Sequence, residues 1–259
     1  MPANHPKKST RAAGKPSGAR RTGVARALSK LGVTSRTLAA QWVCAGRVTV
    51  NGKLVHDPET PVLLDHDRLR VDGALVGVAE KRYLMLNKPR GLVTTARDEQ
   101  RRATVYSCFG ESDQWLAPVG RLDKASEGLL LFTNDTAWAD RLLDPASHLR
   151  KVYHVQIDRR LDDAQLKQMR GGVRMEDGTR LRVGAVRILR EGEKNSWLEI
   201  GLEEGKNRHI RRLLETMEIK VLRLIRVAIG PLKLGELPKG HSRALTKHEL
   251  QAVAAALKD

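Results

Sequence analysis

The residues with the clearest potential for chemistry lie in one short block, residues 120–135. The block reads Gly-Arg-Leu-Asp-Lys-Ala-Ser-Glu-Gly-Leu-Leu-Leu-Phe-Thr-Asn-Asp. Its apolar run, Leu129–Phe132, is bounded by turn residues and predicts a buried strand with Asp123 on a short loop beside it. A carboxylate held there can act as a nucleophile or a base, or it can simply cap a turn. Asp123 and Glu127 could also form the carboxylate pair of a glycosidase, which needs ~5–10 Å between them.

A second block combines cations with a helical apolar pattern. Residues 205–213 read Gly-Lys-Asn-Arg-His-Ile-Arg-Arg-Leu, in which Ile210 and Leu213 give the helix a buried side. A carboxylate that must stay ionised away from water requires a cation within hydrogen-bonding distance, and this block can supply one. The alternative interpretation is a basic, solvated helix face.

Strand and helix patterns alternate irregularly around these blocks. Strands are predicted at residues 83–86, 129–132, 152–157, 196–202 and 221–227, and helices near residues 136–143, 162–170 and 208–217. Strands interrupted by helices at irregular spacing indicate an α+β fold with a mixed sheet rather than a regular doubly wound fold.

The first part of the chain has a different organisation. Residues 1–20 contain Lys, Arg, Ala, Gly, Ser and Pro without an apolar period, so we expect a disordered basic arm. Two short helices are predicted next, the second N-capped by Thr34-Ser35. Two hairpins follow, around the turns Asn51-Gly52 and Asp72-Gly73.

The charge of the chain favours a polyanionic partner. The formal net charge is +17 and the pI is near 10.3. Residues 1–56 hold eleven Lys and Arg residues and no Asp or Glu. Basic residues neutralise phosphates and release their counterions, although a basic run can also be a solvated tail.

Several classes of protein are excluded by the composition. No apolar segment follows the first basic residues as in a signal peptide, and no apolar run is long enough for a membrane span. Cys44 and Cys108 lie far apart, which indicates neither a disulfide framework nor a metal cluster. We therefore expect a cytoplasmic protein.

Several motifs together resemble the pseudouridine synthases, specifically the RsuA/RluB branch that acts on ribosomal RNA. The Gly-Arg-Leu-Asp and Ser-Glu-Gly segments of residues 120–128 carry the resemblance first. The other matching segments are Asn87-Lys88-Pro89-Arg90-Gly91, Lys151-Val152-Tyr153, the basic block of residues 205–213 and the strand of residues 222–231. Residues 21–78 look like an S4 RNA-binding domain, although a small α+β module with solubilising lysines would share their pattern.

The resemblance implies both the architecture and the partners. It implies a small S4 α/β domain (residues 21–78), a linker (79–82) and a catalytic domain (83–259) built on a mixed, largely antiparallel sheet flanked by helices. It also implies isomerisation of a uridine without a cofactor or metal. The partner would be ribosomal RNA or a ribosomal subunit precursor, with the large subunit slightly preferred. Separately, a monomer is expected because no long apolar stripe of the sequence requires a partner.

Three residues take catalytic roles by this resemblance. Asp123 would be the catalytic carboxylate, attacking C1′ of the uridine or acting as a base at C2′. Arg211 would pair with Asp123, and Tyr153 would stack on the target base and assist proton removal. A core-packed strand tyrosine is the alternative for Tyr153. A non-catalytic ribosome-binding protein using only its S4 domain is the rival class, but it has no need of these three residues.

The resemblance also implies contacts to RNA or to the target base. Arg121 would replace the flipped base or form a plain ion pair, and Leu224, or by strand alternation Ile225, would line the uracil pocket. His209 departs from the glutamine usual in the family. The predicted RNA- and substrate-binding residues are Arg121, Lys88, Arg90, Lys206, Asn207, Arg208 and Leu224 in the catalytic domain and Arg36, Arg47 and Lys53 in the S4 domain.

Overall fold

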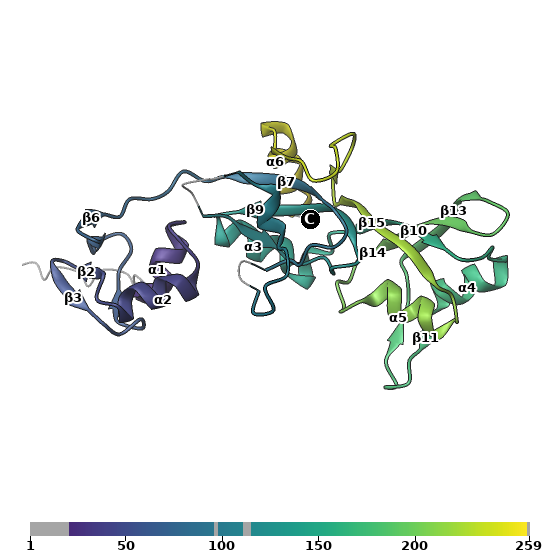
Figure 1. Ribbon diagram of the computed structural model, residues 1–259, viewed down its shortest axis with the longest axis horizontal. Coiled ribbons are helices and arrows are strands. Elements are labelled where there is room, and N and C mark those ends of the chain that lie inside the picture. The colour runs from purple at the N-terminus through teal and green to yellow at the C-terminus, as the bar shows by residue number, and fades with distance from the viewer. Residues whose placement is uncertain (1–20, 96–97, 111–114, 258–259) are drawn as a thin grey trace, which may run out of the picture.

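The computed structural model describes residues 21–95, 98–110 and 115–257. The molecule is elongated, with a small helix–hairpin module at one end and one large sheet through the remainder (Figure 1). The predicted basic arm, residues 1–20, lies outside the described residues.

The N-terminal module confirms the helix and hairpin predictions. Ser35 caps the second helix, because its hydroxyl accepts a hydrogen bond from the amide of Leu38 at 3.0 Å. Positive φ at Asn51 (52°) and Gly52 (81°) matches the predicted hairpin turn. The elements are β1 (Thr22–Gly23), α1 (Val24–Lys30), α2 (Arg36–Cys44), β2 (Val48–Val50), β3 (Lys53–Val55), β4 (Pro61–Val62), β5 (Leu69–Val71) and β6 (Ala74–Leu75).

Residues 79–82, predicted as a linker, are held by Asn134. This residue directly follows the strand β9 (Glu127–Thr133) of the large sheet. The side chain of Asn134 accepts a hydrogen bond from the Arg82 amide and donates one to the Glu80 carbonyl, both at 2.8 Å. On the other side, the Ala79 amide donates to the Leu31 carbonyl at 3.0 Å. The chain between module and sheet is therefore attached to both.

The large sheet is mixed and mostly antiparallel, as predicted. Its order is β13-β14-β10-β15-β9-β7-β17, with β16 on β15 and β8 on β9, and β15 and β9 form the parallel pair. The strands are β7 (Tyr83–Lys88), β8 (Ala117–Val119), β9 (Glu127–Thr133), β10 (Lys151–Ile157), β13 (Ala185–Glu191), β14 (Ser196–Leu202), β15 (Val221–Ile229), β16 (Leu232–Lys233) and β17 (Ser242–Ala244).

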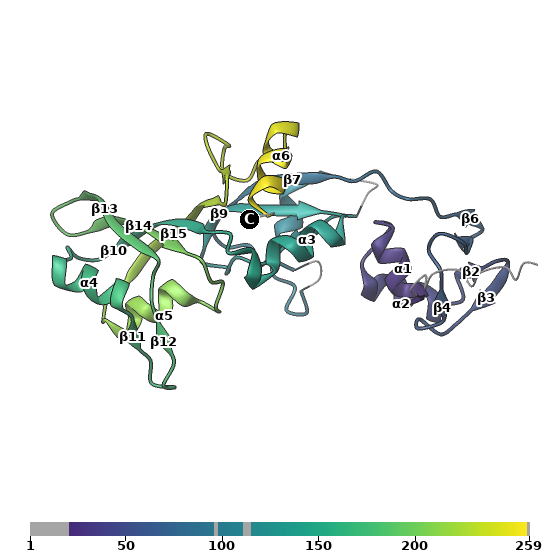
Figure 2. The ribbon, with the colours of Figure 1, turned by 180° about the vertical axis from the view of Figure 1, so that it is seen from behind.

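Helices cover the sheet in two groups (Figures 1 and 2). The helices α4 and α5 pack on one face of β10, β13, β14 and β15, whereas α3 and α6 pack near β7 and β9. The remaining elements are α3 (Thr136–Leu143), α4 (Asp163–Gly171), α5 (His209–Thr216), α6 (Lys247–Ala256), the 3-10 helices η1 (Val105–Cys108) and η2 (Pro145–Ser147), and the short hairpin β11 (Val173–Arg174) with β12 (Arg180–Leu181).

Strand β9 is buried on both faces, as its apolar run predicts. Leu129 and Leu131 contact the cluster that includes α3 and α6, whereas Leu130 and Phe132 pack under the segment containing η1. Gly128 occupies the point where β9 meets β15. Its φ is +101°, and a Cβ there would lie 2.3 Å from the carbonyl oxygen of Arg226. Only glycine permits this approach.

Substitution of Gly128 tests this junction. We expect Gly128→Ala to lower the free energy of unfolding by about 3 kcal/mol, because the new methyl group combines backbone strain with an overlap. Denaturant unfolding measures this change. Gly77→Ala is the control, since a Cβ there meets nothing within 4 Å. Equal stability of the two variants would contradict the proposed constraint.

Candidate active site

The Asp123 loop connects β8 to β9 and is fixed on both sides of the carboxylate. Leu122 is buried, and its carbonyl accepts a hydrogen bond from the Thr94 hydroxyl at 2.8 Å. The Lys124 carbonyl accepts one from the Gly91 amide at 2.8 Å. The Asp123 side chain remains 41% exposed. The loop therefore presents a carboxylate at a defined position while leaving it accessible to a ligand.

Lys88 lies beneath this loop and corrects one prediction. Its side chain is fully buried, and Nζ donates to the carbonyls of Ser126 (2.9 Å), Pro89 (3.1 Å) and Asp123 (3.2 Å). An ammonium with these bonds cannot face RNA as predicted. It instead positions the Asp123 backbone.

The charge of Lys88 depends on its surroundings. Burial lowers the pKa of Lys88 to about 8, while the negative charges of Asp123 and Glu127 oppose this shift. The ammonium therefore predominates at neutral pH, which suits three carbonyl acceptors.

The structure places Arg211 next to Asp123. Arg211 lies in the first turn of α5, and its Nε is 4.0 Å from Oδ2 of Asp123. Its Nη2 donates to the Ala125 carbonyl at 3.0 Å. Burial lowers the pKa of Arg211 and the Asp123 charge opposes this, but a guanidinium remains cationic. The pair supplies a countercharge and leaves the carboxylate open to substrate.

Tyr153 and Leu224 are placed on the same side of the sheet as α5. In the β10–β15 pairing, Val155 lies opposite Leu224 and Tyr153 lies opposite Arg226, so the side chains of Tyr153 and Leu224 share a face. Leu224 is buried, whereas Tyr153 is half-buried between two apolar clusters. Ile225 points to the opposite face. This arrangement favours Leu224 over Ile225 as a pocket wall.

The Glu127 carboxylate is paired with two cations, Arg223 and Lys239, so it does not suit the role of general acid in a glycosidase. Its buried carboxylate accepts hydrogen bonds from Arg223 at 3.1 and 3.0 Å and from Lys239 at 2.6 Å. Burial acts to raise the pKa of Glu127, but the bonds from Arg223 and Lys239 outweigh it and lower the pKa. A carboxyl kept ionised in this way cannot serve as a general acid near neutral pH.

The other predicted residues of the catalytic domain are exposed. Arg121 forms no ion pair with any described residue, and Lys206 pairs with Glu204 at 2.7 Å. Arg208 adopts φ 48° at the start of α5. The exposed members of the set are Arg90, Arg121, Lys206, Asn207 and Arg208.

In the N-terminal module, two of the three predicted residues form ion pairs. Arg36 lies 2.9 Å from Glu59, and Arg47 donates to Asp72 at 2.9 Å and lies over the ring of Trp42. Lys53 is exposed on β3. All three side chains remain on the surface, where exposed ion pairs contribute little and exchange readily.

Two further properties concern cofactors and membranes. Among residues 21–95, 98–110 and 115–257, no group of His, Cys, Asp and Glu could hold a metal ion. No helix in the same ranges is long and apolar enough to cross a membrane.

Sequence reasoning missed several residues that support the site. Thr94 and Lys239 were not singled out, and Glu127 appeared only as an alternative acid. A charged residue at the start of the buried strand β9 is the available signal for Glu127, because a buried carboxylate requires cationic partners. Nothing local identifies Lys239, which is 112 residues away in the chain.

Comparisons with known proteins identify the families that the two parts of the chain match. Residues 82–216 match the family model described as RNA pseudouridylate synthase, and residues 24–69 match the S4 domain model. A protein of Aquifex aeolicus described as an uncharacterized RNA pseudouridine synthase is 39% identical over 231 residues, which cover 89% of this chain and 92% of that protein.

Two further relatives differ in what they show. Ribosomal large subunit pseudouridine synthase B of Bacillus subtilis is 33% identical, with 88% of this chain and 93% of that protein covered. A crystal structure of a pseudouridylate synthase has a TM-score of 0.63 at 24% identity, with 90% of this chain and 99% of that chain covered. This last likeness concerns the fold alone.

The role of Lys88 can be tested against its neighbour Lys124. We expect Lys88→Met to lower the free energy of unfolding by roughly 3 kcal/mol, because buried carbonyls lose their donor. Lys124→Met, an exposed change in the same loop, should alter it by less than about 0.5 kcal/mol. Denaturant unfolding compares the two. Unchanged stability in Lys88→Met would show that the loop does not need the ammonium.

Proposed function

Because this chain belongs to the RNA pseudouridylate synthase family, we propose that it converts a specific uridine of ribosomal RNA to pseudouridine. The observation that carries this proposal is the Asp123–Arg211 pair, with Nε and Oδ2 4.0 Å apart on a fixed loop. The names of relatives, such as the Bacillus subtilis large-subunit enzyme, support large-subunit RNA as the substrate.

The proposed reaction needs only groups that the chain provides. The N-glycosidic bond of the uridine breaks, the uracil turns within the pocket, and C5 of the base joins C1′ of the sugar. The proton of C5 is lost and N1 gains one, so the product is an isomer. Asp123 would attack C1′ or remove a proton at C2′, and the guanidinium of Arg211 would lie beside it as a countercharge.

The pocket would retain the detached base between Tyr153 and Leu224. A tyrosine ring provides a stacking surface, and its hydroxyl forms no hydrogen bond with any described residue. That hydroxyl is therefore available for proton transfer. Reaching the site requires the uridine to leave its stack, a cost that the surrounding RNA contacts must offset.

The N-terminal module would deliver the enzyme to structured RNA. It matches the S4 domain model, and Lys30, Arg36, Arg47 and Lys53 are exposed on its surface. We place the protein in the cytoplasm, where ribosomal RNA is modified, and propose that it acts as a monomer.

The catalytic role of Asp123 is tested by an isosteric change. We expect Asp123→Asn to abolish pseudouridine formation in ribosomal RNA while leaving RNA affinity within about twofold, because the amide keeps the shape but is neither a nucleophile nor a base. Mapping pseudouridines in rRNA from cells with and without the protein identifies the target. Asp140→Asn, an exposed change on α3, is the control, and full activity of Asp123→Asn would reject the assignment.

The S4 surface is tested by removing two charges that form no ion pair in the described structure. We expect Lys30→Gln with Lys53→Gln to weaken RNA binding and to reduce the slope of log K against log salt by about 1.5, since each phosphate contact contributes about 0.7–0.9. Fluorescence anisotropy with a labelled rRNA stem-loop measures this slope at several salt concentrations. A slope equal to that of the wild type would show that this surface does not contact phosphate.

A further inference from the structure

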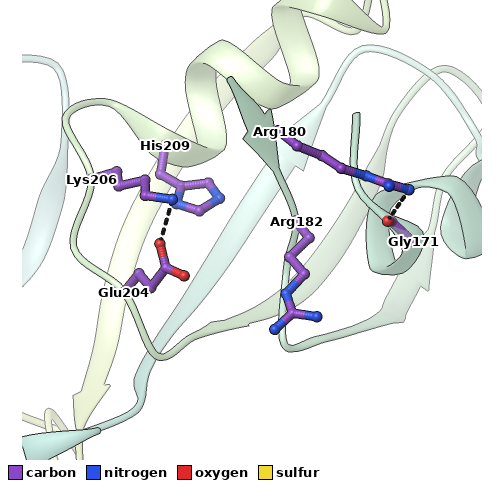
Figure 3. A pocket seen from close by; sticks show the side chains of 6 residues that line it. All are labelled: Gly171, Arg180, Arg182, Glu204, Lys206 and His209. Carbon is purple, nitrogen blue, oxygen red and sulfur yellow. Dashed lines mark hydrogen bonds and ion pairs between the residues drawn. The ribbon is translucent and has the colours of Figure 1, made fainter. Parts of the chain in front are cut away.

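A basic cavity lies beside the N-terminal end of α5 (Figure 3). Its volume is about 290 Å³. His209 and Arg211 are two positions apart in α5, which places their side chains about 200° apart around the helix axis. The cavity is therefore separate from the reaction site. It is lined by Gly171, Arg180, Arg182, Glu204, Lys206 and His209.

His209 is the unexplained group in this cavity. It is 5% exposed, and neither ring nitrogen has a hydrogen-bond partner among the residues that the structure describes. The carbonyl of Arg182 favours a protonated ring without reaching hydrogen-bonding geometry, while burial acts more strongly and lowers the pKa of His209. A buried imidazole without partners costs stability, and an external acceptor in the cavity would remove that cost.

The charges around the imidazole suit an anion. Arg180 and Arg182 lie on one side of the cavity, and Lys206 and Glu204 lie with His209 on the other (Figure 3). Arg182 is exposed and forms no ion pair with any described residue. Glu204 is the one carboxylate in the lining, and Lys206 neutralises it at 2.7 Å. The two arginines therefore leave a net positive charge.

The two walls of the cavity are held together without a ligand. Arg212 of α5 pairs at 2.6 Å with Asp177, which lies in the turn of the β11–β12 hairpin. Arg180 of the hairpin donates to the carbonyl of Gly171 at the end of α4, at 2.8 Å. A site with preformed walls binds a ligand without the cost of ordering them.

We propose that this cavity binds a phosphate group of the RNA backbone outside the target nucleotide, with His209 as a donor. The inference rests on the proposed function. Phosphate matches the arginine guanidiniums, the positive end of α5 and a donor hydrogen of the imidazole. RNA is favoured over a free anion because Asn207 and Arg208 are exposed between the cavity residue Lys206 and the start of α5. The same helix carries Arg211.

The test begins with the exposed arginine. We expect Arg182→Gln to weaken binding of a labelled rRNA stem-loop about tenfold and to reduce the slope of log K against log salt by about 0.7–1. Arg141→Gln, an exposed change on α3, is the matched control and should leave both unchanged. Equal affinities and slopes for the two variants would overturn the proposal.

Substitution of His209 separates binding from packing. We expect His209→Leu to weaken RNA binding while raising the unfolding temperature, because it removes a buried polar group without partners. His209→Gln should restore much of the affinity through its amide donor. If His209→Leu binds RNA as tightly as the wild type, the imidazole serves packing alone and its assigned role is wrong.

Inorganic phosphate distinguishes the two sources of the anion. At matched ionic strength, phosphate should displace the stem-loop from the full-length protein no better than chloride does. Displacement by low millimolar phosphate that disappears in Arg182→Gln would identify a free-anion site and overturn the RNA assignment. Pseudouridine formation by the wild-type protein is measured in parallel, so that failure of the proposed activity is recognised separately from failure of this site.

Discussion

The backbone contact between Gly128 and Arg226 is the constraint on which the site depends. It joins β9 to β15 and thereby connects the half of the sheet that carries the Asp123 loop to the half that carries Tyr153, Leu224 and α5. Glu127 reinforces the same junction through Arg223 of β15 and through Lys239. A side chain at position 128 would push β9 away from β15. The Asp123 carboxylate would then move away from Tyr153, Leu224 and α5.

A buried cation organises the loop that this junction supports. Lys88 donates to the carbonyl of its neighbour Pro89 and to those of Asp123 and Ser126, which lie 35 and 38 residues further along the chain. Its ammonium therefore satisfies loop carbonyls that have no partner in a regular sheet or helix. The charge also lies close to the reactive carboxylate. Lys88 thus shapes the site through its backbone and contributes to its positive potential without touching a ligand.

Turns and strands could be predicted from the sequence where neighbouring residues determine the local structure. Asn51-Gly52 specifies its own turn, and the apolar run after Gly128, bounded by turn residues, favours a buried strand. Lys88 was misread because its local context, Asn-Lys-Pro-Arg-Gly, resembles an exposed basic loop, and its partners lie far along the chain. Helix α6 was missed although Thr246 and Glu249 form a capping box. The cavity at His209 depends on a hairpin of two-residue strands, too short for a periodic pattern to reveal.

The attachment of Asn134 to the linker sets a distance. Asn134 follows the last residue of β9, and the Asp123 loop precedes the first, so the strand separates the N-terminal module from the carboxylate. Seven residues at about 3.3 Å each give roughly 23 Å. The linker attachment and the Asp123 loop are therefore held one strand length apart at opposite ends of β9.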